Sequence, residues 1–184
     1  MLSPVALLVC GQIVLMGSIA LCYRLQPGVV RRGVPLSHYG VLRASRVAFS
    51  IGFGVGALCI ATAGARLLKT MPHAESLQII LAITAVGMVG TILAPYSPKY
   101  FSLYFVHVLC AWTVFMLQVV AGLWVAMFTD NWLNWLLYGG VLLGGLLILL
   151  SFRSIKILAS FAMGQLLVIN ASMLLIARTI SGMS

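Results

Sequence analysis

The stretch from Val141 to Leu150 reads VLLGGLLILL and contains no polar side chain. A strand of a membrane barrel alternates apolar and polar residues over about ten positions, so this stretch does not fit a barrel. Helices and closed barrels are the two structures that satisfy every backbone hydrogen bond inside a bilayer. The stretch therefore predicts a membrane-spanning helix and an all-α fold.

Five further apolar runs accompany this one along the chain. Each run reaches the roughly 17 to 25 residues that a helix needs to cross about 30 Å of hydrocarbon. All six prolines lie at or outside the ends of the runs, so we expect unbroken helices. The result is a polytopic integral membrane protein, one transmembrane domain over residues 1–184 that forms a six-transmembrane-helix bundle with short loops. The predicted spans cover about residues 5–23, 47–65, 77–94, 101–128, 133–152 and 157–177.

The composition excludes the common soluble classes. Only 7% of the side chains are charged and 62% are apolar, whereas soluble domains carry about 25% charged residues. Cytosolic enzymes, secreted disulfide scaffolds and disordered chains are therefore excluded. The first apolar run is kept as a span rather than a cleaved signal, because Met1 to Cys10 has no Lys or Arg and no small-residue cleavage site follows.

The basic residues predict the orientation of the chain. Eleven Lys and Arg stand against only Glu75 and Asp130, which gives a net charge of +9. Eight of the basic residues fall in the first, third and fifth connections, and three fall on the opposite side. Because basic loops stay in the cytoplasm, both termini are predicted to be non-cytoplasmic. The eight are Arg24, Arg31, Arg32, Arg43, Arg46, Lys99, Arg153 and Lys156.

The connection from Arg24 to Arg46 is the only long one, and we expect it at the lipid headgroups. Near an anionic leaflet each arginine contributes on the order of 1 kcal/mol of attraction. The candidate contacts for anionic lipid are Arg24, Arg31, Arg32, Arg43 and Arg46. The alternative is that these arginines only set the topology. Nucleic acid is not an expected partner, since the charge is spread over loop ends and no soluble domain carries it.

Five polar side chains inside the spans form a candidate intramembrane polar site. Such groups need partners in hydrocarbon, so they should face other helices. On the fourth span His107 and Gln118 share one helix face, and we expect it to approach the polar face of the sixth span or Gln12 of the first. For His107 a proton relay or ligand contact and a neutral structural role are both open. The five are Gln12, His107, Gln118, Gln165 and Asn170.

Paired glycines predict close contacts between helices. Gly52 and Gly56 on the second span, and Gly140 and Gly144 on the fifth, are spaced four residues apart. This spacing lets two helix backbones approach each other closely in a membrane. The alternative, a three-plus-three transporter repeat, is not accompanied by any internal sequence repeat.

Several chemistries lack the residues they need. The four cysteines form no CxxC pair or zinc spacing, and two acidic residues are too few for an intramembrane aspartyl pair. No GxSxG serine accompanies His107. The sequence therefore predicts no cofactor, no metal and no catalytic residues.

The segment LSHYG, Leu36 to Gly40, precedes the second span at the end of the longest loop. Together with six short-looped spans, it resembles the six-helix uncharacterised membrane proteins allied to the DRAM and Sfk group. The resemblance implies a non-enzymatic membrane role in lipid organisation or regulation and carries over no catalytic residues. It also implies a first loop on the non-cytoplasmic side, whereas the arginines here predict the cytoplasmic side.

These observations favour a small non-enzymatic membrane protein that acts through lipid or protein contacts. Its candidate partners are membrane lipids, including anionic ones, and other membrane subunits of a complex or further copies of the chain. The alternative is a small transporter or channel with a polar path between helices. An enzyme is the third alternative and would need a cofactor supplied by a partner.

Overall fold

The computed structural model describes residues 2–28, 35–70, 75–97, 99–128, 131–151 and 159–183. Within these residues every apolar run forms one long helix, and a short 3-10 helix, η1 (Leu36–Gly40), follows the first. Each long helix is long and apolar enough to cross a membrane, so the all-α prediction with six such helices is confirmed. The long helices are α1 (Pro4–Leu25), α3 (Arg46–Thr70), α4 (Glu75–Leu93), α5 (Phe101–Phe128), α6 (Trp132–Ser151) and α7 (Ala159–Met183).

The helices begin and end where capping residues and backbone hydrogen bonds allow, and not always where the apolar runs end. Ser3 caps α1 by accepting a hydrogen bond from the Ala6 amide at 3.1 Å, and Pro4 occupies the first turn, where no backbone donor is lost. At α3 and α7 the helix continues past the predicted ends at residues 65 and 177. Polar residues such as Arg66 end an apolar run without ending a helix, because their backbone groups still pair within it.

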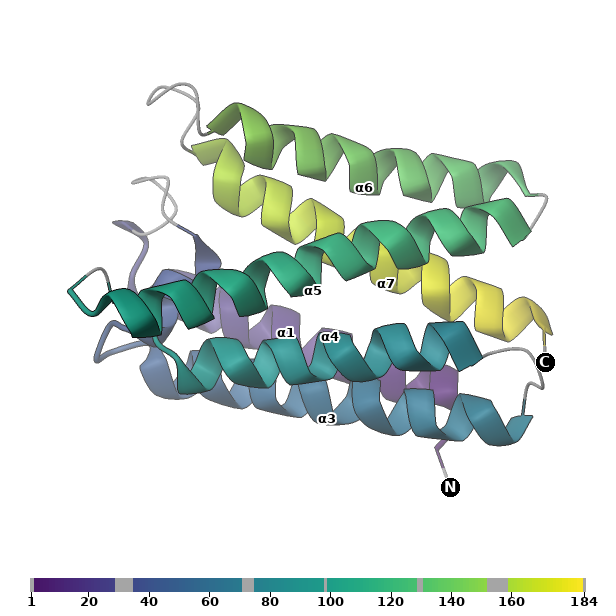
Figure 1. Cartoon of the computed structure of the whole chain (residues 1–184), viewed down its shortest axis with the longest axis horizontal. Helices are drawn as coiled ribbons and strands as arrows, with labels where there is room; N and C mark the ends of the chain where they lie inside the picture. The colour runs from purple at the N-terminus through teal and green to yellow at the C-terminus, as the bar shows by residue number, and fades with distance from the viewer. Residues whose placement is uncertain are drawn as a thin grey trace.

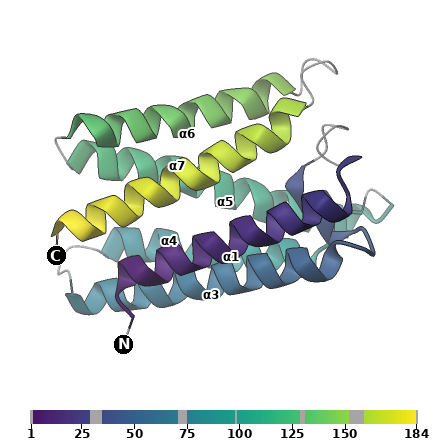
Figure 2. The same ribbon diagram turned by 180° about the vertical axis from the view of Figure 1, so that it is seen from behind.

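The helices pack mainly against their neighbours in the sequence, but α5 and α6 make little contact with each other. Helix α3 packs between α1 and α4, and α4 packs against α5. Helix α6 is held mainly by α7 and only sparingly by α5, while α7 also contacts α1 and α5. Figure 1 and Figure 2 show α6 along one edge of the bundle, while α7 starts beside the end of α6 and runs obliquely across the bundle. Because α6 contacts α5 only sparingly, one side of α5 is weakly covered.

The two termini lie at the same end of the bundle, as an even number of crossings requires (Figure 1). The opposite end carries η1 and is called the η1 end below. The last turns of α1, α4 and α6 and the first turns of α3, α5 and α7 also lie there. The described helix ends that flank the three basic connections therefore all lie at the η1 end.

Glycines bring α6 and α7 into backbone contact. A Cβ added to Gly144 would lie 2.8 Å from the Gly164 carbonyl oxygen, and one added to Gly164 would lie 2.6 Å from the Gly144 carbonyl oxygen. No side chain fits at either position without moving a backbone. The predicted packing role of Gly144 is thus visible, although its partner Gly164 lies on α7 and was not anticipated.

Candidate functional site

The 3-10 helix η1 is inserted among the helices instead of lying on them. The side chains of Leu36 and Tyr39 are 1% and 0% exposed. The Leu36 amide donates to Gln165 Oε1 of α7 at 2.8 Å, and Ser45 Oγ donates to the Tyr39 carbonyl at 2.8 Å. We expected the whole connection from Arg24 to Arg46 at the headgroups. In its second half, apolar side chains of η1 are packed into the protein, which the sequence did not indicate.

Tyr39 is the most enclosed side chain of η1. Its hydroxyl has no hydrogen-bond partner among the described residues, and burial raises the pKa of this phenol to about 12. Ionisation in a buried site would cost the charged form its hydration, so Tyr39 stays neutral at physiological pH. The ring therefore fills buried space at the η1 end as an apolar side chain does.

His107 of α5 is tied to η1 by a hydrogen bond that links two distant parts of the chain. Its Nδ1 lies 2.6 Å from the Ala94 carbonyl oxygen, and its Nε2 lies 2.8 Å from Ser37 Oγ. A carbonyl oxygen only accepts, so Nδ1 carries the proton and Nε2 accepts from the Ser37 hydroxyl. Both nitrogens of the neutral ring are thereby satisfied. These contacts match the structural role that was one of the two alternatives for His107.

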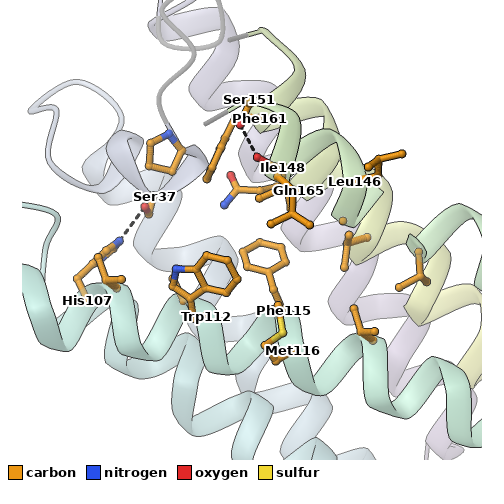
Figure 3. Close-up of a pocket in the computed structure, with 18 of the residues that line it drawn as sticks. Ser37, His107, Trp112, Phe115, Met116, Leu146, Ile148, Ser151, Phe161 and Gln165 are labelled. Atoms are coloured by element: carbon orange, nitrogen blue, oxygen red, sulfur yellow. Dashed lines mark hydrogen bonds between the residues drawn. The ribbon is translucent and has the colours of Figure 1, made fainter. Parts of the chain in front are cut away.

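A cleft of about 560 Å³ lies beside this histidine, between α5, α6 and α7 (Figure 3). Its volume is in the range of small-molecule sites. Tyr104 to Val119 of α5 line one wall, a length of about 22 Å at 1.5 Å per residue. The other wall comes from residues of α6. Phe161, Gln165 and Val168 of α7 also line the cleft, and Pro35, Ser37 and Tyr96 line one end of it.

The outer edge of the cleft lies on the surface of the bundle. On the α5 side Trp112 and Met116 line it, and on the α6 side Leu142, Leu146 and Leu149 do. All five side chains are also exposed on the outside of the protein. The cleft therefore opens sideways, toward the surroundings of the helices. In a bilayer that opening would face lipid.

The polar groups of the cleft gather at one of its ends. They belong to η1, to the segment before α5, to the first turns of α5 and α7 and to the last residue of α6, all of which lie at the η1 end. Toward the middle of the bundle the walls are apolar, with Val119 and Val141 among them. The cleft is thus amphipathic along its length. Its hydroxyl, imidazole and amide side chains are Ser37, Tyr96, Tyr104, His107, Ser151 and Gln165.

The five predicted intramembrane polar residues do not meet in one place. His107 and Gln165 line the cleft. Gln118 lines a second cavity of about 30 Å³ together with Gln165, and Gln118 Oε1 has no hydrogen-bond partner among the described residues. The expected approach of the polar faces of α5 and α7 is therefore seen, and η1 lies between them.

Gln12 and Asn170 form a separate pair between α1 and α7. Gln12 Nε2 donates to Asn170 Oδ1 at 2.7 Å, and Asn170 Nδ2 donates to the Leu166 carbonyl at 2.7 Å. Neither residue lines the cleft. The bond between Gln12 and Asn170 is an interhelical hydrogen bond that holds α1 and α7 together, whereas the bond to Leu166 lies within α7.

The arginines proposed for lipid contact lie at the η1 end but outside the cleft. Arg24, Arg43 and Arg46 are exposed, and none of them lines the cleft. Arg31 and Arg32 lie outside the described residues. The sequence identified these charges, but it held no sign of the cleft or of its contact with η1.

Metal ligands do not cluster in the part of the chain that is described, where no group of three or more His, Cys, Asp or Glu side chains occurs. Comparison with known proteins found no family, no curated protein and no solved structure that matches the chain. The functional interpretation is therefore built on the site itself.

Proposed function

We propose that the chain is a multi-pass integral membrane protein that binds one lipid-like amphiphile in the α5–α6–α7 cleft and acts through this contact without catalysis. Support for the membrane comes from the outward faces of the helices. Large apolar side chains such as Ile13, Leu58 and Val86 are about two-thirds exposed there. So much apolar surface is stable in hydrocarbon and a liability in water.

The observation that carries the lipid proposal is the shape of the cleft. Spread over about 22 Å of α5, a volume of about 560 Å³ gives a mean cross-section of roughly 25 Å². A helix about 10 Å across is several times larger in section. One hydrocarbon chain fits the cleft, whereas a helix of a partner subunit does not. Contact with other membrane subunits or a second copy is therefore proposed only for the outer faces.

The transporter alternative receives less support. It predicts that the five polar side chains line one path, and Gln12 and Asn170 lie instead in their own pair at the α1–α7 interface. The proposed lipid role also agrees with the role that the resemblance to the DRAM and Sfk group implies. The resemblance itself stays a proposal.

Filling the cleft tests the proposed function. A Cβ added to Gly145, which lines the cleft, meets no atom within 4 Å. Gly145→Trp should therefore fold and place its indole where the chain of the amphiphile lies. Native mass spectrometry in mild detergent is expected to show one retained lipid on the wild type and at least about a tenfold lower occupancy on the variant.

Gly139→Trp is the matched control on the same helix. Its added Cβ also meets no atom within 4 Å, and Gly139 does not line the cleft. This control should retain lipid like the wild type. Equal retention by Gly145→Trp and the wild type would contradict the proposed function.

The orientation is a further part of the proposal: both termini are non-cytoplasmic, in line with the positive-inside bias. Ser181→Cys at the terminal end and Arg43→Cys at the η1 end place one exposed thiol at each end. A membrane-impermeant maleimide applied to intact cells should label Ser181→Cys, and it should label Arg43→Cys only after permeabilisation. The unchanged chain with its four cysteines gives the background, and the reverse pattern would overturn the assignment.

A further inference from the structure

We infer that the amphiphile is anionic and that its charged head, a phosphate or a carboxylate, lies under η1 with the tail along the cleft. This inference rests on the proposed function and adds the chemical class of the ligand. Lipid tails are as apolar as the cleft walls, so burial of a tail in the cleft does not distinguish one lipid from another. Selection must come from the polar end.

The direction of the bound molecule follows from the distribution of polar groups. Ser37, His107 and Gln165 stand at the η1 end of the cleft (Figure 3). The cleft runs from there toward the middle of the bundle between apolar walls. A polar head in the apolar half would lose its hydrogen bonds without replacement, which is unfavourable. The head therefore lies beside η1, at the depth where the bundle ends.

The hydrogen-bond chemistry of this end favours an acceptor. Neutral His107 uses its N–H on the Ala94 carbonyl, and Ser37 uses its O–H on His107. Gln165 is only 5% exposed, and its Oε1 already accepts from Leu36. Its Nε2 carries two hydrogens, for which the described residues provide no acceptor, and Figure 3 shows this amide beside Ser37 in the cleft. Gln165 therefore offers N–H donors to a ligand, and the Tyr96 and Tyr104 hydroxyls that also line this end can donate as well.

The charge around this end selects an anion among the possible acceptors. Arg24, Arg43, Arg46 and Lys99 are exposed there. The chain has only two acidic residues: Glu75 begins α4 at the other end, and Asp130 lies outside the described residues, after α5 in the sequence. Unopposed basic residues at the membrane surface attract anionic headgroups. The N–H donors of Gln165 and the electrostatic field of these basic residues act on the same end of the cleft.

The test compares three probes on the purified protein in a neutral detergent at low salt. The probes are phosphatidylglycerol, phosphatidylcholine with the same acyl chains, and oleate. Native mass spectrometry should show phosphatidylglycerol or oleate retained roughly tenfold or more over phosphatidylcholine. Preference for phosphatidylglycerol would identify a membrane phospholipid as the source of the anionic head, and preference for oleate would identify a free fatty acid. Both results support the inference.

Two variants separate the charge from the donors. Arg43→Gln with Arg46→Gln changes only exposed side chains and should remove most of the roughly tenfold anionic preference, since each charge contributes about a fivefold factor. Gln165→Glu keeps an oxygen for the Leu36 amide and replaces the donors with an acceptor, so it should abolish the preference. If Gln165→Glu fails to fold, the arginine variant still decides the charge dependence.

The inference and the proposed function fail in different ways. Equal retention of phosphatidylcholine and both anionic probes, with all retention lost in Gly145→Trp, would overturn the anionic assignment and leave the lipid cleft standing. Retention that Gly145→Trp leaves unchanged would overturn both. An anionic preference that survives in the double arginine variant and in Gln165→Glu would place the anion elsewhere and overturn the inference.

Discussion

Replacing Gly164 by valine is expected to separate α6 from α7 and to lower the free energy of unfolding by about 3 kcal/mol, at the upper end of the range for overpacked cores. A Cβ at this position meets the Gly144 carbonyl oxygen at 2.6 Å and the Ile148 amide nitrogen at 3.1 Å. Both atoms are backbone, so no rotamer change relieves the contact. The two helices must move apart.

The effect should be large because α6 has few other supports. It is held mainly by α7 and touches α5 sparingly. In a membrane no hydrophobic force drives helices together, so their association depends on close packing and hydrogen bonds. Loss of the glycine contact therefore weakens the main support of α6. Since α6 also forms one wall of the cleft, lipid retention should fall together with stability.

Unfolding in a denaturing-detergent titration, followed by circular dichroism, measures this effect. Gly139→Val on α6 is the control, because it makes the same exchange at a position whose added Cβ meets no atom within 4 Å. The control should change stability by less than about 1 kcal/mol. A Gly164→Val variant as stable as Gly139→Val would show that α6 and α7 are not in backbone contact at Gly164.

His107→Leu is the second change with a large expected effect, a loss of about 2 to 4 kcal/mol of stability. The substitution leaves the Ser37 hydroxyl and the Ala94 carbonyl without their partner in a buried site. Each buried group left unsatisfied costs about 1 to 3 kcal/mol. The loss should be concentrated at η1, which this histidine ties to α5 and to the end of α4.

The labelling rate of the Cys22 thiol measures how tightly η1 is packed. Cys22 is 0% exposed, and its thiol donates to the Ser45 carbonyl at 3.5 Å, next to the bond between Ser45 and Tyr39. In a background that retains Cys22 as the one cysteine, His107→Leu should speed its labelling by a thiol-reactive dye. Unchanged labelling together with unchanged stability would contradict the role assigned to His107.

A double-mutant cycle isolates the contact between His107 and Ser37. Ser37→Ala should cost about 1 kcal/mol in the wild-type background, because it leaves His107 Nε2 without a donor. In the His107→Leu background the same change should cost much less. Strict additivity of the two changes would mean that the hydrogen bond contributes nothing of its own.

The number of helices and their approximate ends were readable from the sequence. Inside hydrocarbon each helix satisfies its backbone hydrogen bonds locally, so the length of an apolar run is enough to identify it. The run from Phe101 to Phe128 was predicted with both ends as observed. The division of the basic residues was likewise readable, because it depends only on which connection each residue occupies.

The cleft and its polar end were decided by tertiary structure alone. Ser37 and His107 are 70 positions apart, and Leu36 and Gln165 are 129 apart. Periodicity within one helix showed which polar residues share a face, but it does not connect a residue of η1 to its partner on a distant helix. The width of the cleft depends on the packing of α6 against α7 rather than against α5. Backbone contact at Gly144 and Gly164 sets this packing. Local hydrophobicity carries no information on such an angle.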